Sequence, residues 1–287
     1  MNLLNTNLTL DYINNIFRTT NRLIDPNNDN STFLKGFILC NCFFEPSTRT
    51  SLSFNSAMLR MGGSVMALDK STSSIQKGES DYDTLKTIEQ YCDIIVVRHP
   101  SKEFIFNYAS KCSKPIINGG NGDGEHPTQA LLDLYIIKKY FPEKSIKILF
   151  VGDIKHSRTI HSLENLLSLY HDVDIDYFPY PTCEKESKNN ISNYDNINKY
   201  DVVYMTRLQV ERFESNNNPN FNMNNYILNK DIADRMREDA IILHPLPRNN
   251  ELDISVDDCK QAKYLDEQMK YGVYVRMAIL YHHLKCI

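Results

Sequence analysis

The sequence contains no tryptophan, no C-x-x-C pair and no uninterrupted apolar run near the roughly 20 residues that cross a bilayer. Residues 1–20 lack the basic segment and the apolar block of a secretory signal. We therefore expect no membrane partner and take the cytoplasm as the default compartment. The seven cysteines are an odd set without metal-ligand spacing, so we expect buried, reduced thiols and neither disulfides nor zinc ligands.

The signatures of several enzyme and binding classes are also missing. There is no H-E-x-x-H, no clustered Cys and His and no G-x-S-x-G, which disfavours a metal site and a hydrolase nucleophile. Residues 119–124 are glycine-rich and expected to form a loop, but they lack the Walker Lys-Ser/Thr and the acidic ribose partner of a dinucleotide fold. The formal net charge of −4 argues against a nucleic-acid partner. We expect no metal and no cofactor, so catalysis would use positioned charges and hydrogen bonds on an activated substrate.

Strand-like and helix-like patterns alternate along the chain. Strands are expected at 37–44, 63–68, 92–97, 115–118, 147–151, 173–178, 200–205 and 240–243, and helices at 8–23, 83–91, 102–112, 130–140, 159–170, 231–237 and 272–285. This alternation is typical of an α/β fold with parallel sheets, and 287 residues suit two domains. We expect two such domains, each a parallel β-sheet flanked by helices, joined by interdomain helices. The predicted boundaries are 1–141 and 142–271, with 272–287 packing back on the first domain.

The most informative stretch is residues 37–63, which is expected to form a strand, a turn and a helix. The turn is Ser47-Thr48-Arg49-Thr50. The free N–H groups at a helix start favour an anion such as phosphate, and a guanidinium binds phosphate through two hydrogen bonds. For this turn alone, the alternative that Ser47 or Thr48 caps the helix and Arg49 is solvated stays open.

Basic side chains also follow other predicted strands. Because the carboxyl ends of parallel strands line the ligand crevice of an open sheet, these residues are expected there. An acidic protein that collects its basic side chains at this edge is expected to bind anions. For any single arginine a surface ion pair is an equally good explanation, whereas the set favours a pocket. The set is Arg49, Arg98, His126, Arg158 and Arg207, with Arg248 just beyond the last strand.

Short motifs then occur in a fixed order over nearly the whole chain. They are F-E-P-S-T-R-T-S at 44–51, S-I-Q-K-G-E-S at 74–80, V-V-R-H-P at 96–100, E-H-P-T-Q-A-L-L-D at 125–133, V-G-D-I-K-H-S-R-T-I-H-S at 151–162, Y-M-T-R-L-Q-V-E-R at 204–212 and L-H-P-L-P-R at 243–248. Together they resemble the catalytic chain of the aspartate carbamoyltransferase family. Ornithine carbamoyltransferases carry a cysteine where this chain has Pro245.

The resemblance implies the reaction and a set of binding roles. Carbamoyl phosphate and L-aspartate would give N-carbamoyl-L-aspartate and phosphate, the second step of pyrimidine (UMP) biosynthesis, with no cofactor. The implied carbamoyl phosphate ligands are Ser47, Thr48, Arg49, Thr50 and Arg98 for the phosphate; Thr50, Arg98 and His126 for the carbonyl oxygen; and Gln129 with the loop Pro245, Leu246 and Pro247 for the carbamoyl NH2. The implied aspartate ligands are Arg158, Arg207 and Gln209.

The resemblance also implies a homotrimer with shared active sites. In the family a neighbouring subunit supplies a serine and a lysine, which match Ser73 and Lys77, so the implied catalytic set is Arg49, Thr50, Lys77, Arg98 and His126. The departing phosphate is expected to take the amine proton, with His126 as general base the alternative. The chain begins near the family's usual start and ends on its last helix, so we expect no regulatory domain within it.

Two departures from the family pattern stand out. Asn121 replaces the usual aspartate before His126, and residues 213–223 are Asn-rich where the family has a mobile loop near the aspartate site. Two alternatives stay open, another amino acceptor and a catalytically silent scaffold or ligand sensor, whereas a simple phosphate-binding module does not explain Arg158 and Arg207. The resemblance leaves binding of a regulatory chain or of other pyrimidine-pathway enzymes undecided.

Overall fold

The computed structural model describes residues 2–142, 145–170, 172–184, 189–209 and 222–285. By internal contacts the chain forms two units, Met1–Leu132 with Lys270–Ile287, and Asp133–Met269. Each unit contains one four-stranded sheet. The domain boundaries expected from the sequence, 1–141 and 142–271, remain a prediction, since this division is based on contacts within the chain.

The sheet of the first unit is parallel throughout, with the strand order β2-β1-β3-β4. Its two central strands are apolar and buried, as expected where helices cover both faces of a parallel sheet. Side chains of α3 and α4 pack with those of β1 and β3 in one core cluster. The strands are β1 (Ile38–Phe43), β2 (Ser64–Ala67), β3 (Ile94–His99) and β4 (Ile116–Asn121), and the helices are α1 (Leu10–Ile24), α2 (Thr48–Arg60), η1 (Ser74–Lys77), α3 (Asp81–Ile88) and α4 (Phe104–Ala109).

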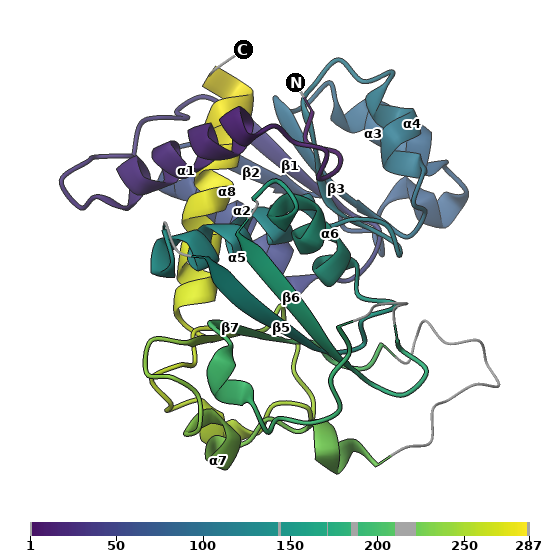
Figure 1. Cartoon of the computed structure of the whole chain (residues 1–287). Coiled ribbons are helices and arrows are strands. Elements are labelled where there is room, and N and C mark those ends of the chain that lie inside the picture. The colour runs from purple at the N-terminus through teal and green to yellow at the C-terminus, as the bar shows by residue number, and fades with distance from the viewer. Residues whose placement is uncertain (1, 143–144, 171, 185–188, 210–221, 286–287) are drawn as a thin grey trace. The chain divides into compact units, whose positions relative to one another are not determined.

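Two long helices cross from one unit to the other along the chain. They are α5 (Pro127–Tyr140) and α8 (Glu267–Lys285). In the first unit α8 lies beside α1 (Figure 1), where the Tyr12 hydroxyl and His283 Nε2 are 3.0 Å apart. Thr9 is the N-cap residue of α1, and its hydroxyl accepts a hydrogen bond from the Tyr12 backbone N–H at 3.2 Å.

The second unit repeats the design, with a parallel sheet in the order β6-β5-β7-β8. The strand β5 ends at Gly152, whose φ is 116° and where a Cβ atom would lie 2.1 Å from the Thr206 carbonyl oxygen, so only glycine fits. The strands are β5 (Ile146–Gly152), β6 (Val173–Pro179), β7 (Val202–Met205) and β8 (Ile241–Leu243), and the helices are α6 (Arg158–Leu167), η2 (Ile197–Lys199), η4 (Met223–Tyr226), α7 (Lys230–Ala233) and η5 (Ile254–Val256).

The expected fold class is confirmed, and several element bounds are corrected. Residues 119–121 belong to β4 and are not a loop, because His99 of β3 pairs with Asn121 across a register shift. The helix α8 begins at Glu267, five residues before the expected 272, and α7 ends at Ala233. Of the helices in the described ranges, none combines the length and apolar character that a bilayer span requires.

The cysteine expectation is correct only in part. Within the described ranges all six cysteines are free thiols. Cys40, Cys42, Cys92 and Cys183 are buried, whereas Cys112 and Cys259 are partly exposed. The prediction of burial was therefore wrong for the last two.

Candidate functional site

The turn between β1 and α2 has the form expected of an anion site. Ser47 is the N-cap residue of α2, but among the described contacts its hydroxyl makes no capping hydrogen bond to the helix. Thr48 and Arg49 are exposed and Thr50 is buried. The simple capping explanation is therefore wrong for Ser47, whereas the exposure of Arg49 agrees with a solvated side chain. Thr48, Arg49 and Thr50 occupy the first turn of α2, where the backbone N–H groups lack partners within the helix.

Thr50 and His126 are brought together although they are far apart in the sequence. Thr50 Oγ1 lies 3.5 Å from His126 Nε2, and both residues are 5% exposed. His126 directly precedes α5, and Gln129 follows in the first turn of that helix, 7% exposed. The carboxyl ends of β1 and β4 thus deliver these side chains to one edge of the sheet.

Arg98 lies inside β3 and not beyond its end, in register with Phe43 of β1. Its Nε is 3.4 Å from Glu45 Oε2, and its Nη1 donates to the Gly119 carbonyl oxygen at 3.4 Å. The guanidinium therefore has a carboxylate partner that follows β1, close to the turn that starts α2.

Ser73 and Lys77 lie at the two ends of the short helix η1, after β2. Ser73 precedes η1, and its hydroxyl donates to the Lys70 carbonyl oxygen at 3.1 Å. Lys77 is exposed at the end of η1. Among the described contacts neither side chain touches Arg49 or His126.

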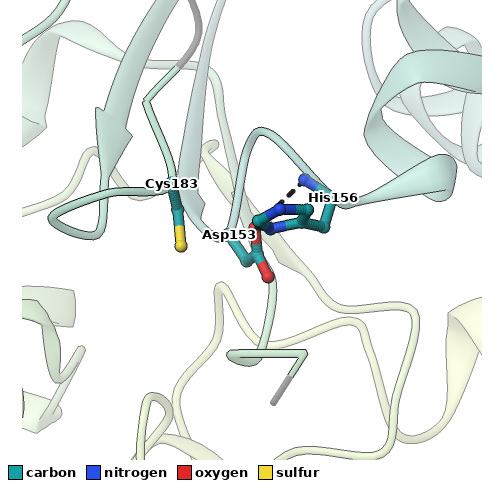
Figure 2. A group of neighbouring side chains, drawn as sticks. All are labelled: Asp153, His156 and Cys183. Carbon is teal, nitrogen blue, oxygen red and sulfur yellow. Dashed lines mark hydrogen bonds and ion pairs between the residues drawn. The ribbon is translucent and has the colours of Figure 1, made fainter. Parts of the chain in front are cut away.

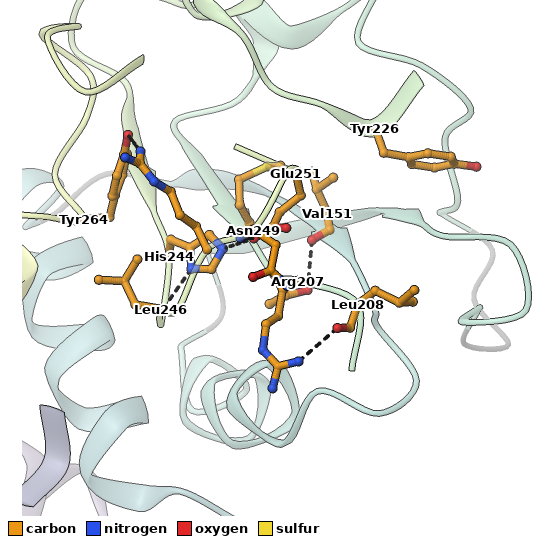
Figure 3. Close-up of polar contacts among 12 residues, drawn as sticks. Val151, Arg207, Leu208, Tyr226, His244, Leu246, Asn249, Glu251 and Tyr264 are labelled. Atoms are coloured by element: carbon orange, nitrogen blue, oxygen red, sulfur yellow. Dashed lines mark hydrogen bonds and ion pairs between the residues drawn. The ribbon is translucent and has the colours of Figure 1, made fainter. Parts of the chain in front are cut away.

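In the second unit the predicted residues again follow strand ends. Arg158 begins α6 after β5 and is 8% exposed. Arg207 follows β7, and its Nη1 donates to the Leu208 carbonyl oxygen at 3.0 Å (Figure 3). The Gln209 backbone N–H donates to Asp153 Oδ2 at 3.1 Å. Asp153 thus ties the segment after β7 to the end of β5.

The loop after β8 is held by a buried pair that sequence analysis missed. His244 Nε2 lies 2.9 Å from Glu251 Oε1, and the Leu246 backbone N–H donates to His244 Nδ1 at 2.8 Å (Figure 3). Because Nδ1 accepts, Nε2 carries the proton and donates to Glu251. Pro245 and Leu246 are partly buried, and Pro247 is exposed.

Arg248 does not belong with the other basic residues. Its guanidinium forms a double contact with the Asp257 carboxylate, in which Nη2 lies 2.7 Å from Oδ2, and Nη1 donates to the Tyr264 hydroxyl at 3.2 Å. The hydrogen bond from Arg248 is the main reason why the pKa of Asp257 is lowered. Arg248 therefore links the end of the loop after β8 to Asp257 and Tyr264.

One group of donors within the described residues could hold a metal ion. It comprises Asp153, His156 and Cys183, whose ligand atoms lie within 4.8 Å of one another (Figure 2). Asp153 Oδ1 accepts from the His156 backbone N–H at 3.1 Å and lies 2.9 Å from His156 Nδ1. Burial, together with the nearby Asp153 charge, raises the pKa of the Cys183 thiol to about 12. The sequence showed no such pattern because Cys183 follows a different strand, β6, and the hydrogen bonds above join only Asp153 and His156.

Comparisons with known proteins identify the family of this chain. The family model "Aspartate/ornithine carbamoyltransferase, carbamoyl-P binding domain" matches residues 3–139, and the model "Aspartate/ornithine carbamoyltransferase, Asp/Orn binding domain" matches residues 144–283. An aspartate carbamoyltransferase catalytic subunit from Methanocaldococcus jannaschii is 46% identical, covering 86% of this chain and 85% of that protein. One from Thermoplasma acidophilum is 41% identical, covering 96% of this chain and 95% of that protein.

A solved structure extends the likeness to three dimensions. Aspartate transcarbamoylase from Trypanosoma cruzi, crystallised in complex with carbamoyl phosphate, is similar with a TM-score of 0.89 and 33% identity over 99% of this chain and 96% of that one. The family models together span both units, and the relatives match over most of their own lengths. This chain belongs to the aspartate/ornithine carbamoyltransferase family.

Proposed function

We propose that this chain is an aspartate carbamoyltransferase, which transfers the carbamoyl group of carbamoyl phosphate to the amine of L-aspartate, giving N-carbamoyl-L-aspartate and phosphate in pyrimidine biosynthesis. The observation that carries the proposal is the contact of 3.5 Å between Thr50 and His126, beside the start of the 13-residue helix α2. This contact places two polar groups suited to a carbonyl oxygen next to groups suited to a phosphate.

In the proposed reaction the amine attacks the carbonyl carbon, and the bond from that carbon to the phosphate oxygen breaks. Ser47, Thr48, Arg49 and Thr50 bind the phosphate together with Arg98. Thr50, Arg98 and His126 stabilise the negative charge that develops on the carbonyl oxygen as the amine attacks. The departing phosphate takes the amine proton, so the protein needs no base of its own.

The remaining ligands orient the two substrates. Gln129 and the backbone carbonyls of Pro245 and Leu246, with Pro247 shaping the loop, hold the carbamoyl NH2. Arg158 and Arg207 each bind one carboxylate of aspartate, aided by Gln209. Two carboxylate-binding arginines suit a dicarboxylic acceptor, and Pro245 replaces the cysteine of the ornithine enzymes. Part of the segment 213–223 lies outside the described residues, and its effect on aspartate binding stays a prediction.

We further propose a cytoplasmic homotrimer in which Ser73 and Lys77 enter the site of a neighbouring subunit. The exposure of Lys77, and the absence of a described contact from Ser73 or Lys77 to Arg49, support this. The exposed apolar side chains of the first unit supply a surface for a second copy. Leu52 and Leu59, seven residues apart on α2, are each 60% exposed, and Met66 on the edge strand β2 is 37% exposed. A regulatory chain or another pyrimidine-pathway enzyme would be an additional partner of that trimer.

The first experiment measures carbamoyl-aspartate formation by the purified protein, with L-ornithine as the competing acceptor. We expect turnover with aspartate only, unchanged after dialysis against a chelator because no metal takes part. Arg49→Ala abolishes turnover, whereas Arg60→Ala, an exposed arginine at the far end of the same helix, retains it. Absence of turnover with both acceptors in folded trimers would favour the scaffold alternative.

Subunit mixing tests the shared site. Lys77→Ala and Arg49→Ala chains are inactive alone, but a hybrid trimer contains some sites with neither substitution. We expect activity to return on mixing after mild dissociation and reassembly. Mixing Arg49→Ala with Arg98→Ala is the control. In the proposal both residues of a site come from the same chain, so every site of this mixture carries one of the two substitutions and no activity should return. Equal failure of both mixtures would mean that Lys77 acts within its own chain.

A further inference from the structure

A continuous chain of buried hydrogen bonds runs through the second unit from α5 to the loop after β8. The Tyr204 hydroxyl donates to Asp133 Oδ2 at 2.8 Å, and Gln268 Nε2 donates to Asp133 Oδ1 at 2.6 Å. Gln268 Oε1 accepts from the His244 backbone N–H at 3.0 Å. The His244 side chain then bonds Glu251, and the members Tyr204, Asp133, Gln268, His244 and Glu251 are each at most 1% exposed.

Every link in this chain has one orientation. Gln268 donates at one end and accepts at the other, so its amide cannot be reversed without losing both bonds. The Leu246 N–H fixes the His244 tautomer, and Glu251 Oε1 also accepts from the Asn249 N–H at 2.9 Å. A buried network in which every group has a partner is rigid, because each alternative leaves a desolvated polar group unpaired.

The network of hydrogen bonds ends at Leu246, a residue with a strained backbone. Leu246 has φ of 52°, in the left-handed region that a leucine rarely adopts. Such a conformation persists only where the surroundings determine it, and it concentrates at functional sites. Here the Leu246 N–H is held by His244 Nδ1, which fixes the peptide plane before Leu246 and limits where its own carbonyl points.

We propose that His244 is a positioning residue of the carbamoyl transfer site, which holds the Leu246 carbonyl in place for the carbamoyl NH2, and that Glu251 and Gln268 hold His244 in turn. The inference rests on the proposed function, because it takes the Leu246 carbonyl as a carbamoyl ligand. The other end of the network supports it: Asp133 lies one turn after Gln129 on α5, so the helix that carries one proposed NH2 ligand also anchors the loop that carries the other.

The test compares variants along the network with matched controls. His244→Asn keeps an acceptor for the Leu246 N–H but loses the bond to Glu251, and His244→Leu loses both. Glu251→Gln keeps an acceptor for His244. Gln268→Leu is matched by Gln261→Leu, a buried glutamine whose Nε2 donates to the Arg237 carbonyl oxygen at 3.2 Å in the same unit. The readouts are kcat, KM for each substrate and the melting temperature.

We expect Gln268→Leu and His244→Asn to lower kcat by about 10- to 100-fold, with KM for aspartate changed by no more than about twofold, because a misplaced carbonyl disfavours the reactive geometry. His244→Leu lowers kcat further, and Glu251→Gln retains more activity than either His244 variant. Gln261→Leu lowers the melting temperature and leaves kcat unchanged.

Two results would overturn the inference. One is that the His244, Glu251 and Gln268 variants have lower melting temperatures but the same kcat per folded protein as Gln261→Leu. A network with a purely structural role would behave in this way. The other is an equal kcat for His244→Asn and His244→Leu. If His244→Leu does not fold, Glu251→Gln and Gln268→Leu are compared instead. An equal kcat for these two variants would then overturn the inference. Failure of the proposed function is a separate result, since the unsubstituted protein would then lack carbamoyl transfer altogether.

Discussion

The Thr50 hydroxyl oxygen lies 3.5 Å from Nε2 of His126, which joins the first turn of α2 to the residue that precedes α5. Both side chains are buried, so their polar atoms are desolvated before any substrate arrives. Desolvated groups interact more strongly with a developing charge than solvated ones do, because little water screens them. In the proposed mechanism this pair is preorganised for the carbonyl oxygen of the substrate.

Removing either member of the pair should slow the chemical step. We expect Thr50→Val and His126→Asn each to lower kcat by about 10²- to 10³-fold, the usual loss for one donor to a developing oxyanion. KM for aspartate should change little, because neither residue binds that substrate in the proposal. Thr20→Val is the control: this buried threonine on α1 donates to the Ile16 carbonyl oxygen at 2.8 Å, far along the chain from the site residues. A kcat for Thr50→Val equal to that of Thr20→Val would remove Thr50 from the site.

The local sequence pattern predicted the order of strands and helices but not the contacts made between distant segments. Alternating apolar strands and helices specified the α/β fold, and parallel topology placed Arg49 and His126 at one sheet edge. The 3.5 Å contact between Thr50 and His126 depends on side-chain geometry between distant segments, which no local pattern encodes. The buried His244–Glu251 pair was missed for the same reason.

The glycine-rich residues 119–121 were assigned to a loop because glycine disfavours strands. They form the end of β4 because tertiary pairing with β3 overrides that preference. Close packing also explains one glycine there: a Cβ atom on Gly119 would lie 3.2 Å from Val96 Cγ1. Glycine in this strand therefore reflects the close approach of its neighbour.

The exposed leucines of α2 give a test of the proposed trimer. A charge on this face should oppose association, because burying an unpaired carboxylate is unfavourable. We expect Leu59→Glu to shift the protein from trimer to monomer in light scattering and to lose most carbamoyl transfer. Ile254→Glu is the control, since this side chain is 74% exposed in the second unit and should leave both properties unchanged. An active Leu59→Glu trimer would show that this face is not the interface.

Asn121 is the residue at which the chain departs from the family's aspartate, and its contacts explain why an amide is needed. Asn121 Nδ2 donates to the Lys102 carbonyl oxygen at 2.7 Å, and Oδ1 accepts from the Glu125 N–H at 2.8 Å. A carboxylate would place an acceptor against the carbonyl. We expect Asn121→Asp to lower the free energy of unfolding by about 1–3 kcal/mol. Denaturant titration measures it, with Asn196→Asp, an exposed site, as the control for added charge. Equal stabilities of the two variants would contradict this account.

The Arg248–Asp257 pair predicts how stability depends on pH. Hydrogen bonding from Arg248 lowers the pKa of Asp257 below its ordinary value of 3.8; burial opposes this, and the Tyr264 hydroxyl adds to it. A carboxyl group whose folded pKa is depressed stabilises the fold at pH values above its unfolded pKa. That contribution is lost as pH falls from about 3.8 through the lower folded value, because the unfolded chain then takes up a proton first.

Replacing this carboxylate should therefore flatten the acid side of the stability profile. We expect Asp257→Asn to be less stable than the unsubstituted protein near neutral pH, and the difference to shrink as pH falls below about 4, since both proteins then lack the charge. Urea titrations at a series of pH values measure the slope. Asp234→Asn, which removes the partner of Lys230 in a largely exposed pair at 2.9 Å, should change the profile much less because solvent screens that pair. A difference between Asp257→Asn and the unsubstituted protein that stays constant down to the lowest pH would mean that lost packing and not lost charge explains the effect.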